Sequence, residues 1–135
     1  MSALLFFAGK TAYKQIKDAG LNPGDVAVVA GAAGGPKWLV LNRLDRYLFS
    51  QWFTGREAPL FLVGSSIGAW RFAAACQQDP ISAIDRFEAS YLAQAYAAKP
   101  SAEVIDRTLE NVLDQLLNKN GAAEILTHPH YRLSI

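Results

Sequence analysis

The chain has 135 residues, a formal net charge of +1 at pH 7 and a hydrophobic fraction of 51%. This length allows at most one domain, and the hydrophobic fraction is typical of a globular rather than a disordered protein. A charge so close to zero gives no reason to expect nucleic acid as a partner. Apolar residues 3–8 form a run too short to span a membrane and lack the features of a signal peptide. We therefore expect a cytoplasmic protein.

The first expected elements are a short edge strand or apolar lead-in at residues 3–7 and a helix at residues 9–19, which ends at Gly20. Three residues are expected on the inward face of this helix: Ala12, Tyr13 and Ile16. Its outer face carries three lysines at helical spacing: Lys10, Lys14 and Lys17. A solvated surface explains these lysines most simply. The alternative is contact with anionic lipid headgroups, which would place the protein peripherally at a membrane surface.

A glycine-rich loop follows the first clear strand signal. Residues 26–30 form a β-branched apolar run after a turn at residues 22–25, which predicts a strand. Glycines then precede Pro36, which is favoured as the first residue of a helix. We expect that helix to run from Pro36 to about residue 53, with its apolar residues packed against the sheet: Trp38, Leu41, Leu44, Leu48 and Trp52. The backbone N–H groups of Gly34 and Gly35 then lie where no intrahelical acceptor exists, which favours bound negative charge.

A second glycine motif follows the next strand. The apolar run at residues 60–63 predicts a strand, and Gly64-Ser65-Ser66-Ile67-Gly68 then leads into a helix. A G-x-S-x-G spacing between a strand and a helix is typical of a nucleophile elbow, a sharp turn that exposes a serine hydroxyl. Gly64 and Gly68 remove side chains that would crowd this turn. Ser66 is therefore the candidate nucleophile.

The order of these elements predicts that the two glycine loops meet. A strand, a helix and a second strand of these lengths form a βαβ unit with parallel strands. Both loops then leave the carboxyl ends of their strands, at the edge of the sheet where α/β sites form. An anion-stabilising loop beside a serine is the combination that acyl transfer requires.

These two motifs together resemble the patatin-like phospholipase family. Gly34-Gly35-Pro36-Lys37 is similar to the family's glycine-rich loop with a basic residue, and residues 64–68 are similar to its elbow. The resemblance covers roughly residues 8–75, and it departs from the family at Ala33 and Trp38, where glycine is common. It implies an α/β fold, a partial three-layer α/β/α arrangement with a parallel sheet core and a nucleophile elbow.

The same resemblance implies the function. Members are serine lipid acyl hydrolases with a Ser–Asp dyad and no cofactor, so we expect a lipid or small ester substrate and no bound metal. By this resemblance Ser66 attacks the ester carbonyl, the N–H groups of Gly34 and Gly35 form the oxyanion hole, and Lys37 contacts a substrate headgroup or supports the loop. A helix-start lysine exposed to solvent is the simpler interpretation of Lys37.

The aspartate of that dyad has no counterpart in the sequence. The family carries it in an Asp-Gly motif far beyond the serine, and none of the aspartates here precedes a glycine. We therefore expect residues 1–135 to be the N-terminal part of a single patatin-like hydrolase domain, truncated and inactive in isolation, because a serine without a base is a weak nucleophile. The alternative is a non-catalytic remnant that binds lipid or a protein partner.

The rest of the chain predicts helices and a final strand. A helix is expected from Pro80, with Asp79 as its N-cap, to about Ala98, and another from Ser101 to Asn120-Gly121. Both have apolar stripes, so they either cover the site as a lid or simply pack on the core. The alternation at residues 131–135 predicts a strand.

Other candidate residues receive simpler interpretations. His128 and His130 are expected in the loop before the last strand, although an ordinary Ser-acid-His hydrolase would need one of them near Ser66. Gly9-Lys10-Thr11 lacks the glycine that a phosphate-binding P-loop requires, so nucleotide binding is not expected. Cys76 is expected to be a buried structural thiol.

Overall fold

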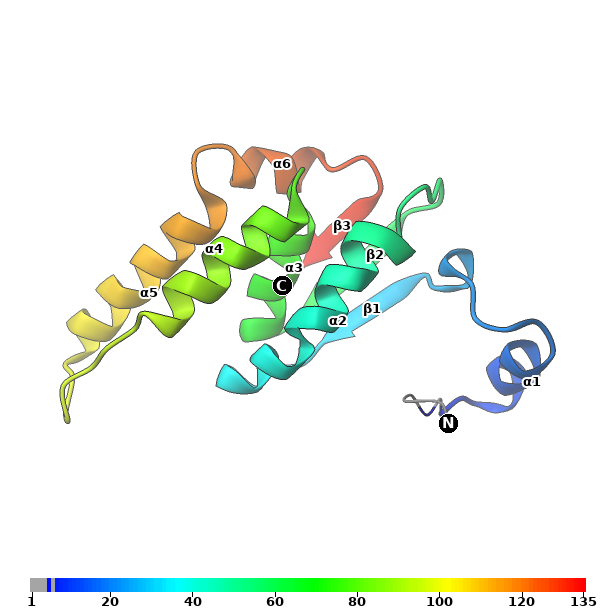
Figure 1. Ribbon diagram of the computed structural model, residues 1–135, viewed down its shortest axis with the longest axis horizontal. Coiled ribbons are helices and arrows are strands. Elements are labelled where there is room, and N and C mark those ends of the chain that lie inside the picture. Colours follow the sequence, from blue (N-terminus) through cyan, green and yellow to red (C-terminus); the bar gives the residue numbers. More distant parts are fainter. Residues whose placement is uncertain (1–4, 6) are drawn as a thin grey trace.

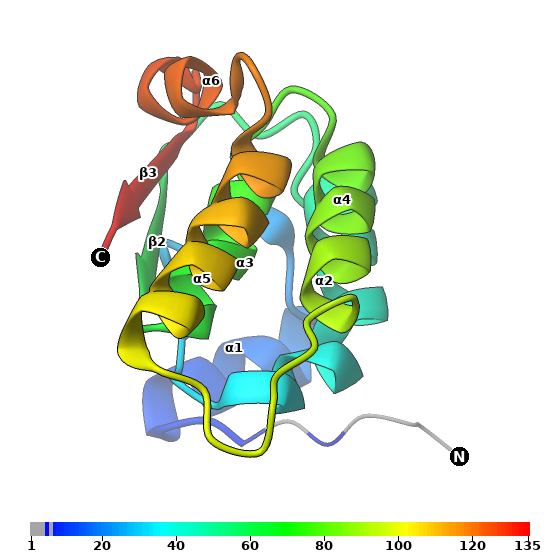
Figure 2. The same cartoon turned by 90° about the vertical axis from the view of Figure 1, so that its left-hand side faces the viewer.

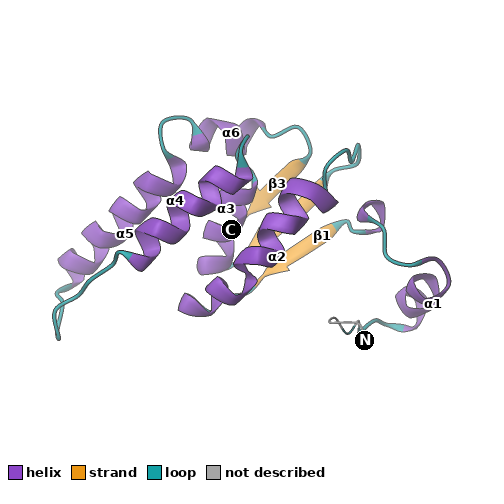
Figure 3. Cartoon of the chain, in the orientation of Figure 1, coloured by secondary structure: helices purple, strands orange, loops and turns teal. Residues whose placement is uncertain are grey.

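The structure is a computed structural model that describes residue 5 and residues 7–135. The edge strand or lead-in expected at residues 3–7 lies largely outside the described residues. The regular elements, in chain order, are α1 (Lys10–Ala19), β1 (Val28–Gly31), α2 (Asn42–Tyr47), β2 (Leu60–Gly64), α3 (Ile67–Ala75), α4 (Pro80–Leu92), α5 (Ala102–Leu117), α6 (Gly121–Thr127) and β3 (Tyr131–Ser134). The expected α/β class is confirmed (Figures 1 and 3).

The three strands form one parallel sheet in the order β1-β2-β3. Gly31 at the end of β1 pairs with Gly64 at the end of β2, and Leu60 pairs with Tyr131 at the start of β3. The predicted parallel pairing of the first two strands is therefore confirmed, as is the final strand. Both glycine loops leave the same edge of the sheet, as the βαβ topology requires.

Apart from α1, the described helices lie on one face of this sheet (Figure 2). Helix α3 packs against all three strands and against α4 and α5 (Figure 2). Strand β2 shows the consequence, because Leu60 and Leu62 are 0% exposed whereas Phe61 and Val63 on the other face are 48% and 47% exposed. The second helical layer of the expected three-layer arrangement is therefore not among the described residues.

Helix α3 is buried along most of its length because its residues are small or apolar. Ala73, Ala74 and Ala75 let the helix lie close to its neighbours, and Phe72 is 1% exposed. The Phe72 ring takes the space above Gly31, where a Cβ would lie 2.7 Å from it. Close packing of this kind fixes the helix on the sheet.

The helical segment after the first glycine loop differs from its prediction. It begins as a 3₁₀-helix at Gly35–Leu41, continues as α2 and ends in a π-helical turn at Leu48–Trp52. The expected inward residues Leu41 and Leu44 are 36% and 41% exposed, so that part of the prediction is wrong. The residues that are buried lie at a regular helical spacing: Trp38, Asn42, Asp45 and Phe49. Two of these positions are polar and pair with charged groups on α3 and α4, so apolar content does not reveal the buried face.

Helix α1 is confirmed in extent but not in its inward face. None of its residues is buried, and Tyr13 is 55% exposed. The described elements do not pack closely on this helix, which lies apart from the sheet and the other helices (Figure 1). An apolar side at helical spacing therefore does not mark a core contact here.

Helices α4 and α5 pack side by side (Figure 2). The predicted N-cap of α4 is confirmed, because Asp79 accepts hydrogen bonds from the backbone N–H and the hydroxyl of Ser82. The helix ends at Leu92 rather than Ala98. In α5, Val112 and Leu116 are buried, but Leu109 and other apolar residues are more than one third exposed. Helix α6 was not predicted.

Arg56 fixes the amino ends of β1 and β2. Its side chain is buried and donates hydrogen bonds to the backbone carbonyls of Pro23, Val26, Ala58 and Pro59. These bonds satisfy carbonyl groups in the turns that precede both strands. One guanidinium thus ties together the segments that enter the sheet at the end opposite to the glycine loops.

Candidate active site

Ser66 lies at a sharp turn between β2 and α3. Its backbone has φ 52° and ψ −126°, a left-handed conformation that is uncommon for a residue with a side chain. Ser65 donates its backbone N–H to the carbonyl of Gly31 over 2.9 Å, which ties the turn to the end of β1. The Ser66 carbonyl accepts the backbone N–H of Ala69 at 2.9 Å. The turn therefore holds an exposed hydroxyl at a strained position.

Gly64 and Gly68 are required by close backbone contacts on either side of this turn. A Cβ at Gly68 would lie 2.1 Å from the carbonyl oxygen of Gly31, and one at Gly64 would lie 2.5 Å from the backbone nitrogen of Ala69. Both contacts are with backbone atoms, which cannot move aside as a side-chain end can. The G-x-S-x-G spacing is thus explained by packing: only glycines let the helix start this close to the ends of β1 and β2.

Gly35 and Ser66 line the same cavity. This cavity has a volume of about 210 Å³, and we call it the serine cavity. Gly35 has φ +52°, which favours glycine, and it is the first residue of its 3₁₀-helix. Its N–H therefore has no acceptor within the helix. The structure brings a candidate donor loop and a candidate nucleophile together at one edge of the sheet.

The walls of the serine cavity come from three helices. Ile67 and Trp70 belong to α3, Tyr91 belongs to α4 and Leu109 belongs to α5. The helix pair α4 and α5, which follows α3, therefore lines this cavity as well as packing on the core. None of the six lining residues carries a carboxylate or an imidazole, so this cavity itself offers no general base to Ser66.

Gly34 and Lys37 lie on a neighbouring apolar groove rather than in the serine cavity. This groove has a volume of about 420 Å³ and runs between β1 and the helical segment 35–52. Ile67 lines both spaces. Of the two predicted oxyanion donors, the structure therefore places Gly35 beside Ser66 and Gly34 one residue further along the loop. Lys37 is exposed at the edge of the groove.

A buried ion pair joins the two halves of the site, and no sequence motif predicts it. Arg71 on α3 donates from Nε to Oδ2 of Asp45 on α2 over 2.7 Å and from Nη2 to Oδ1 over 2.6 Å. The two side chains are only 10% and 5% exposed. This two-pronged contact fixes the helix that follows the glycine loop against the helix that follows Ser66.

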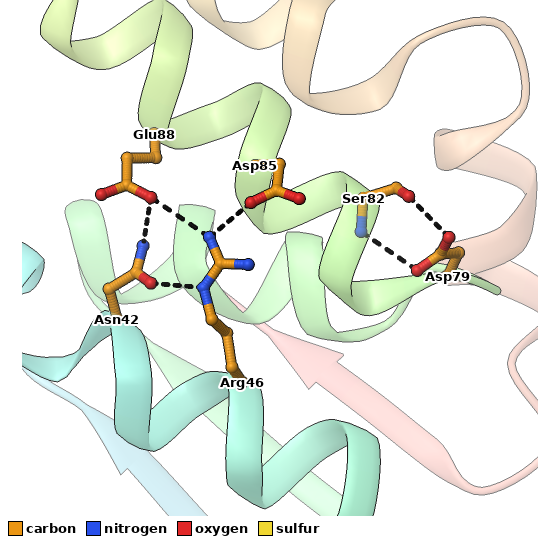
Figure 4. A network of polar contacts seen from close by, with 6 residues as sticks. All are labelled: Asn42, Arg46, Asp79, Ser82, Asp85 and Glu88. Carbon is orange, nitrogen blue, oxygen red and sulfur yellow. Dashed lines mark hydrogen bonds and ion pairs between the residues drawn. The ribbon is translucent and has the colours of Figure 1, made fainter.

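A second polar network joins α2 to α4. Arg46 donates to Asn42 over 2.6 Å and forms ion pairs with Asp85 over 2.6 Å and Glu88 over 3.1 Å (Figure 4). Asn42 also donates to Glu88. The network holds α4 near the glycine loop, and α4 carries Tyr91 of the serine cavity.

Aromatic stacking reinforces the same contact between the loop and α4. Trp38 stacks on Phe87 with ring centroids 4.4 Å apart and meets Tyr91 edge-on at 5.6 Å. The Trp38 ring is 3% exposed. The residue that departs from the family's loop pattern therefore serves as an anchor for the loop, since stacked rings add to the gain from burial.

His128 and His130 lie at the opposite end of the sheet from Ser66. The carbonyl of His130 accepts the backbone N–H of Leu60, which is the first residue of β2. Ser66 lies beyond the other end of this strand, two residues after its last residue, Gly64. The five extended residues of β2 separate these points by roughly 13 Å or more. An ordinary Ser-acid-His hydrolase site is therefore excluded for these histidines, and their predicted place before the last strand is confirmed.

His128 has a structural role there. Its Nδ1 accepts the backbone N–H groups of His130 and Tyr131, and its ring stacks on Tyr131 with centroids 4.2 Å apart. Burial lowers its pKa, and the charges of His130 and Arg132 lower it further. Only the neutral imidazole can accept a hydrogen bond at Nδ1. The neutral form of His128 is therefore the one that holds the backbone at the start of β3.

Two other features bear on chemistry. Cys76 is fully buried and burial raises the pKa of its thiol to about 12, which fits the predicted structural role.

Among the described residues, no group of three or more His, Cys, Asp or Glu side chains is placed to hold a metal ion. Nor is any helix within the described ranges both long and apolar enough to cross a bilayer.

Comparison with known proteins does not add to this geometry. No protein-family model, curated protein or solved structure matches the chain. The site must be interpreted from its own residues.

Proposed function

We propose that the chain belongs to a serine acyl hydrolase of the patatin-like kind, in which Ser66 is the nucleophile of a lipid or small ester hydrolysis. The observation that carries this proposal is the shared cavity of Ser66 and Gly35. The left-handed backbone at Ser66 and the close contacts of Gly64 and Gly68 support the interpretation of this turn as a nucleophile elbow.

The proposed chemistry follows from these positions. The Ser66 hydroxyl oxygen attacks the ester carbonyl carbon, and the carbonyl oxygen gains negative charge as the tetrahedral intermediate forms. The N–H of Gly35 donates to that oxygen, and the N–H of Gly34, the preceding residue in the same loop, is the proposed second donor. Collapse expels the alcohol and leaves an acyl group on Ser66, which water then removes. Preorganised donors of this type account for about 3–4 kcal/mol of transition-state stabilisation each.

A base must accept the hydroxyl proton of Ser66, and the serine cavity contains none. By resemblance to the family this base is an aspartate from a later Asp-Gly motif. We therefore propose that these 135 residues carry the nucleophile and the oxyanion donors, and that turnover requires a carboxylate supplied from outside them.

Active-site labelling tests the proposal without requiring turnover. A fluorophosphonate probe carries its own good leaving group, so we expect slow formation of one covalent adduct that accelerates between pH 7 and pH 9 as hydroxide replaces the missing base. Intact-mass and peptide analysis should locate the adduct at Ser66.

The neighbouring serine provides the matched control. Ser65 is exposed in the same turn, so Ser65→Ala should retain labelling and Ser66→Ala should lose it. Equal labelling of both variants, or an adduct at Ser65, would contradict the assignment.

A second candidate function is supported by the absence of a base in the cavity. In this alternative the chain binds lipid or a partner protein without catalysis. Labelling of Ser66 that is no faster than that of a free serine peptide would favour it, because neither the turn nor Gly35 would then activate the hydroxyl.

A further inference from the structure

The size of the serine cavity limits what can bind beside Ser66. Its volume is about 210 Å³. Pockets for drug-sized ligands have volumes of about 300–1,000 Å³, so this one is small. An apolar cavity of about 150 Å³ holds benzene, a six-carbon ligand. By the same scale the serine cavity holds about six to eight carbon atoms.

The lining is suited to a hydrocarbon chain. Apart from Gly35 and Ser66, every lining residue presents an aliphatic or aromatic side chain: Ile67, Trp70, Tyr91 and Leu109. A carbonyl group that reacts with Ser66 would place its oxygen near Gly35. The chain attached to that carbonyl would then extend toward the four apolar residues.

Packing behind the walls supports the two aromatic side chains of the cavity. Trp70 packs on the ring of Phe87 with centroids 5.9 Å apart, and Tyr91 contacts the same ring at 5.9 Å. Phe87 is itself 0% exposed. Both aromatic walls are therefore supported by a fully buried residue, whereas Gly35, Ser66 and Leu109 are exposed, so the cavity is open to solvent.

We infer that the serine cavity binds the acyl chain of the substrate over about its first six to eight carbon atoms, so that the further carbon atoms of a longer chain lie outside it. This inference rests on the proposed function, since it assigns the acyl side of that site. The neighbouring groove of about 420 Å³ is larger and apolar, but neither Ser66 nor Gly35 lines it.

Binding to the Ser66→Ala variant of the whole chain tests the inference without chemistry. Straight-chain carboxylates from butanoate to tetradecanoate serve as probes in isothermal titration calorimetry, each below its micelle concentration. The carboxylate mimics the charged oxygen near Gly35. We expect affinity to rise by about fourfold for each added methylene up to hexanoate or octanoate and then to change little up to dodecanoate, because the further methylenes lie outside the cavity. Affinity that keeps rising through tetradecanoate, or the failure of all probes to bind, would overturn the inference.

Variants at the rim sharpen the test. In the same Ser66→Ala background, Leu109→Ala opens the cavity and should shift the chain length at which affinity levels off upward, whereas Leu109→Trp fills it and should shift that length toward butanoate. Leu113→Ala is the matched control, because Leu113 is 39% exposed on the same helix and does not line the cavity. An equal effect of Leu109→Ala and Leu113→Ala would also overturn the inference.

The two proposals fail in different ways. Carboxylate affinity that levels off as expected, without fluorophosphonate labelling of the native protein, would retain the acyl-binding cavity and reject the nucleophile. Labelling of Ser66 with carboxylate affinity that does not level off would retain the nucleophile and reject the cavity as the acyl site.

Discussion

At the scale of single residues, the turn at Ser66 depends on glycines beside it, because a Cβ atom at these positions would clash with the backbone. Gly68 lies so close to Gly31 that a Cβ would reach within 2.1 Å of its carbonyl oxygen and 2.5 Å of its carbonyl carbon. The G-x-S-x-G pattern predicts the turn itself. It does not identify Gly31 as the residue against which the helix is packed, because that contact joins segments far apart in the chain.

Replacing Gly68 with alanine should therefore disrupt the fold and not only the site. The clash is with backbone on both sides, so β1 and α3 would have to separate. We expect Gly68→Ala to lower the free energy of unfolding by about 3 kcal/mol or more, at the upper end of overpacking costs. Urea denaturation followed by circular dichroism measures this. Gly24→Ala is the control, since a Cβ there has nothing within 4 Å, and a similar loss in both variants would refute the packing argument.

At the scale of secondary-structure elements, the sequence predicts strands and helices better than the faces they bury. A β-branched run predicts β1, a short apolar run predicts β2 and an alternating run predicts β3, and Asp79-Pro80 predicts the start of α4. The buried face of α2 was not predictable by apolar content, because it consists partly of Asn42 and Asp45. The partners of these residues lie on α3 and α4, so their burial follows from tertiary contacts.

The ion pair between Asp45 and Arg71 should contribute strongly to holding these elements together. Replacing Asp45 with asparagine keeps the shape but leaves Arg71 buried without its counter-charge. We expect a loss of about 3–5 kcal/mol in the free energy of unfolding. Glu103→Gln removes the partner of Arg107 in a pair that is 80% and 76% exposed, and it should change stability by less than about 0.5 kcal/mol. Thermal or urea unfolding of the two variants in parallel measures these losses. Equal losses of unfolding free energy in the two variants would contradict this account.

At the scale of the whole molecule, the sequence predicts an α/β protein whose two glycine loops meet, and the structure shows that arrangement. The open face of the sheet was not predictable. Phe61 and Val63 have the apolar character of strands buried on both faces, yet about half of each side chain is exposed. The local sequence pattern indicates which residues favour burial. It does not show whether another described element packs over them.

The junction between α6 and β3 should make the stability of the whole molecule depend on pH. His128 accepts two backbone N–H groups through Nδ1, so protonation of that nitrogen removes both bonds where β3 enters the sheet. Its pKa in the folded protein lies below 6.5, chiefly because of burial. The unfolded chain therefore takes up the proton first as the pH falls. The contribution of His128 is fully present above about pH 6.5, decreases as the pH falls below that value, and levels off beneath the folded pKa.

A comparison of two histidine variants isolates this effect from that of the carboxylates, which affect stability mainly below about pH 5. Among the carboxylates, the pKa of Asp79 is lowered by its bonds to Ser82. We expect the free energy of unfolding of the native protein to decrease between pH 7 and pH 5 and that of His128→Gln to decrease less over the same interval. His130→Gln should retain most of the native slope, because the His130 side chain does not hold the start of β3. A slope in His128→Gln as steep as the native one would show that His128 does not carry the acid sensitivity of the sheet.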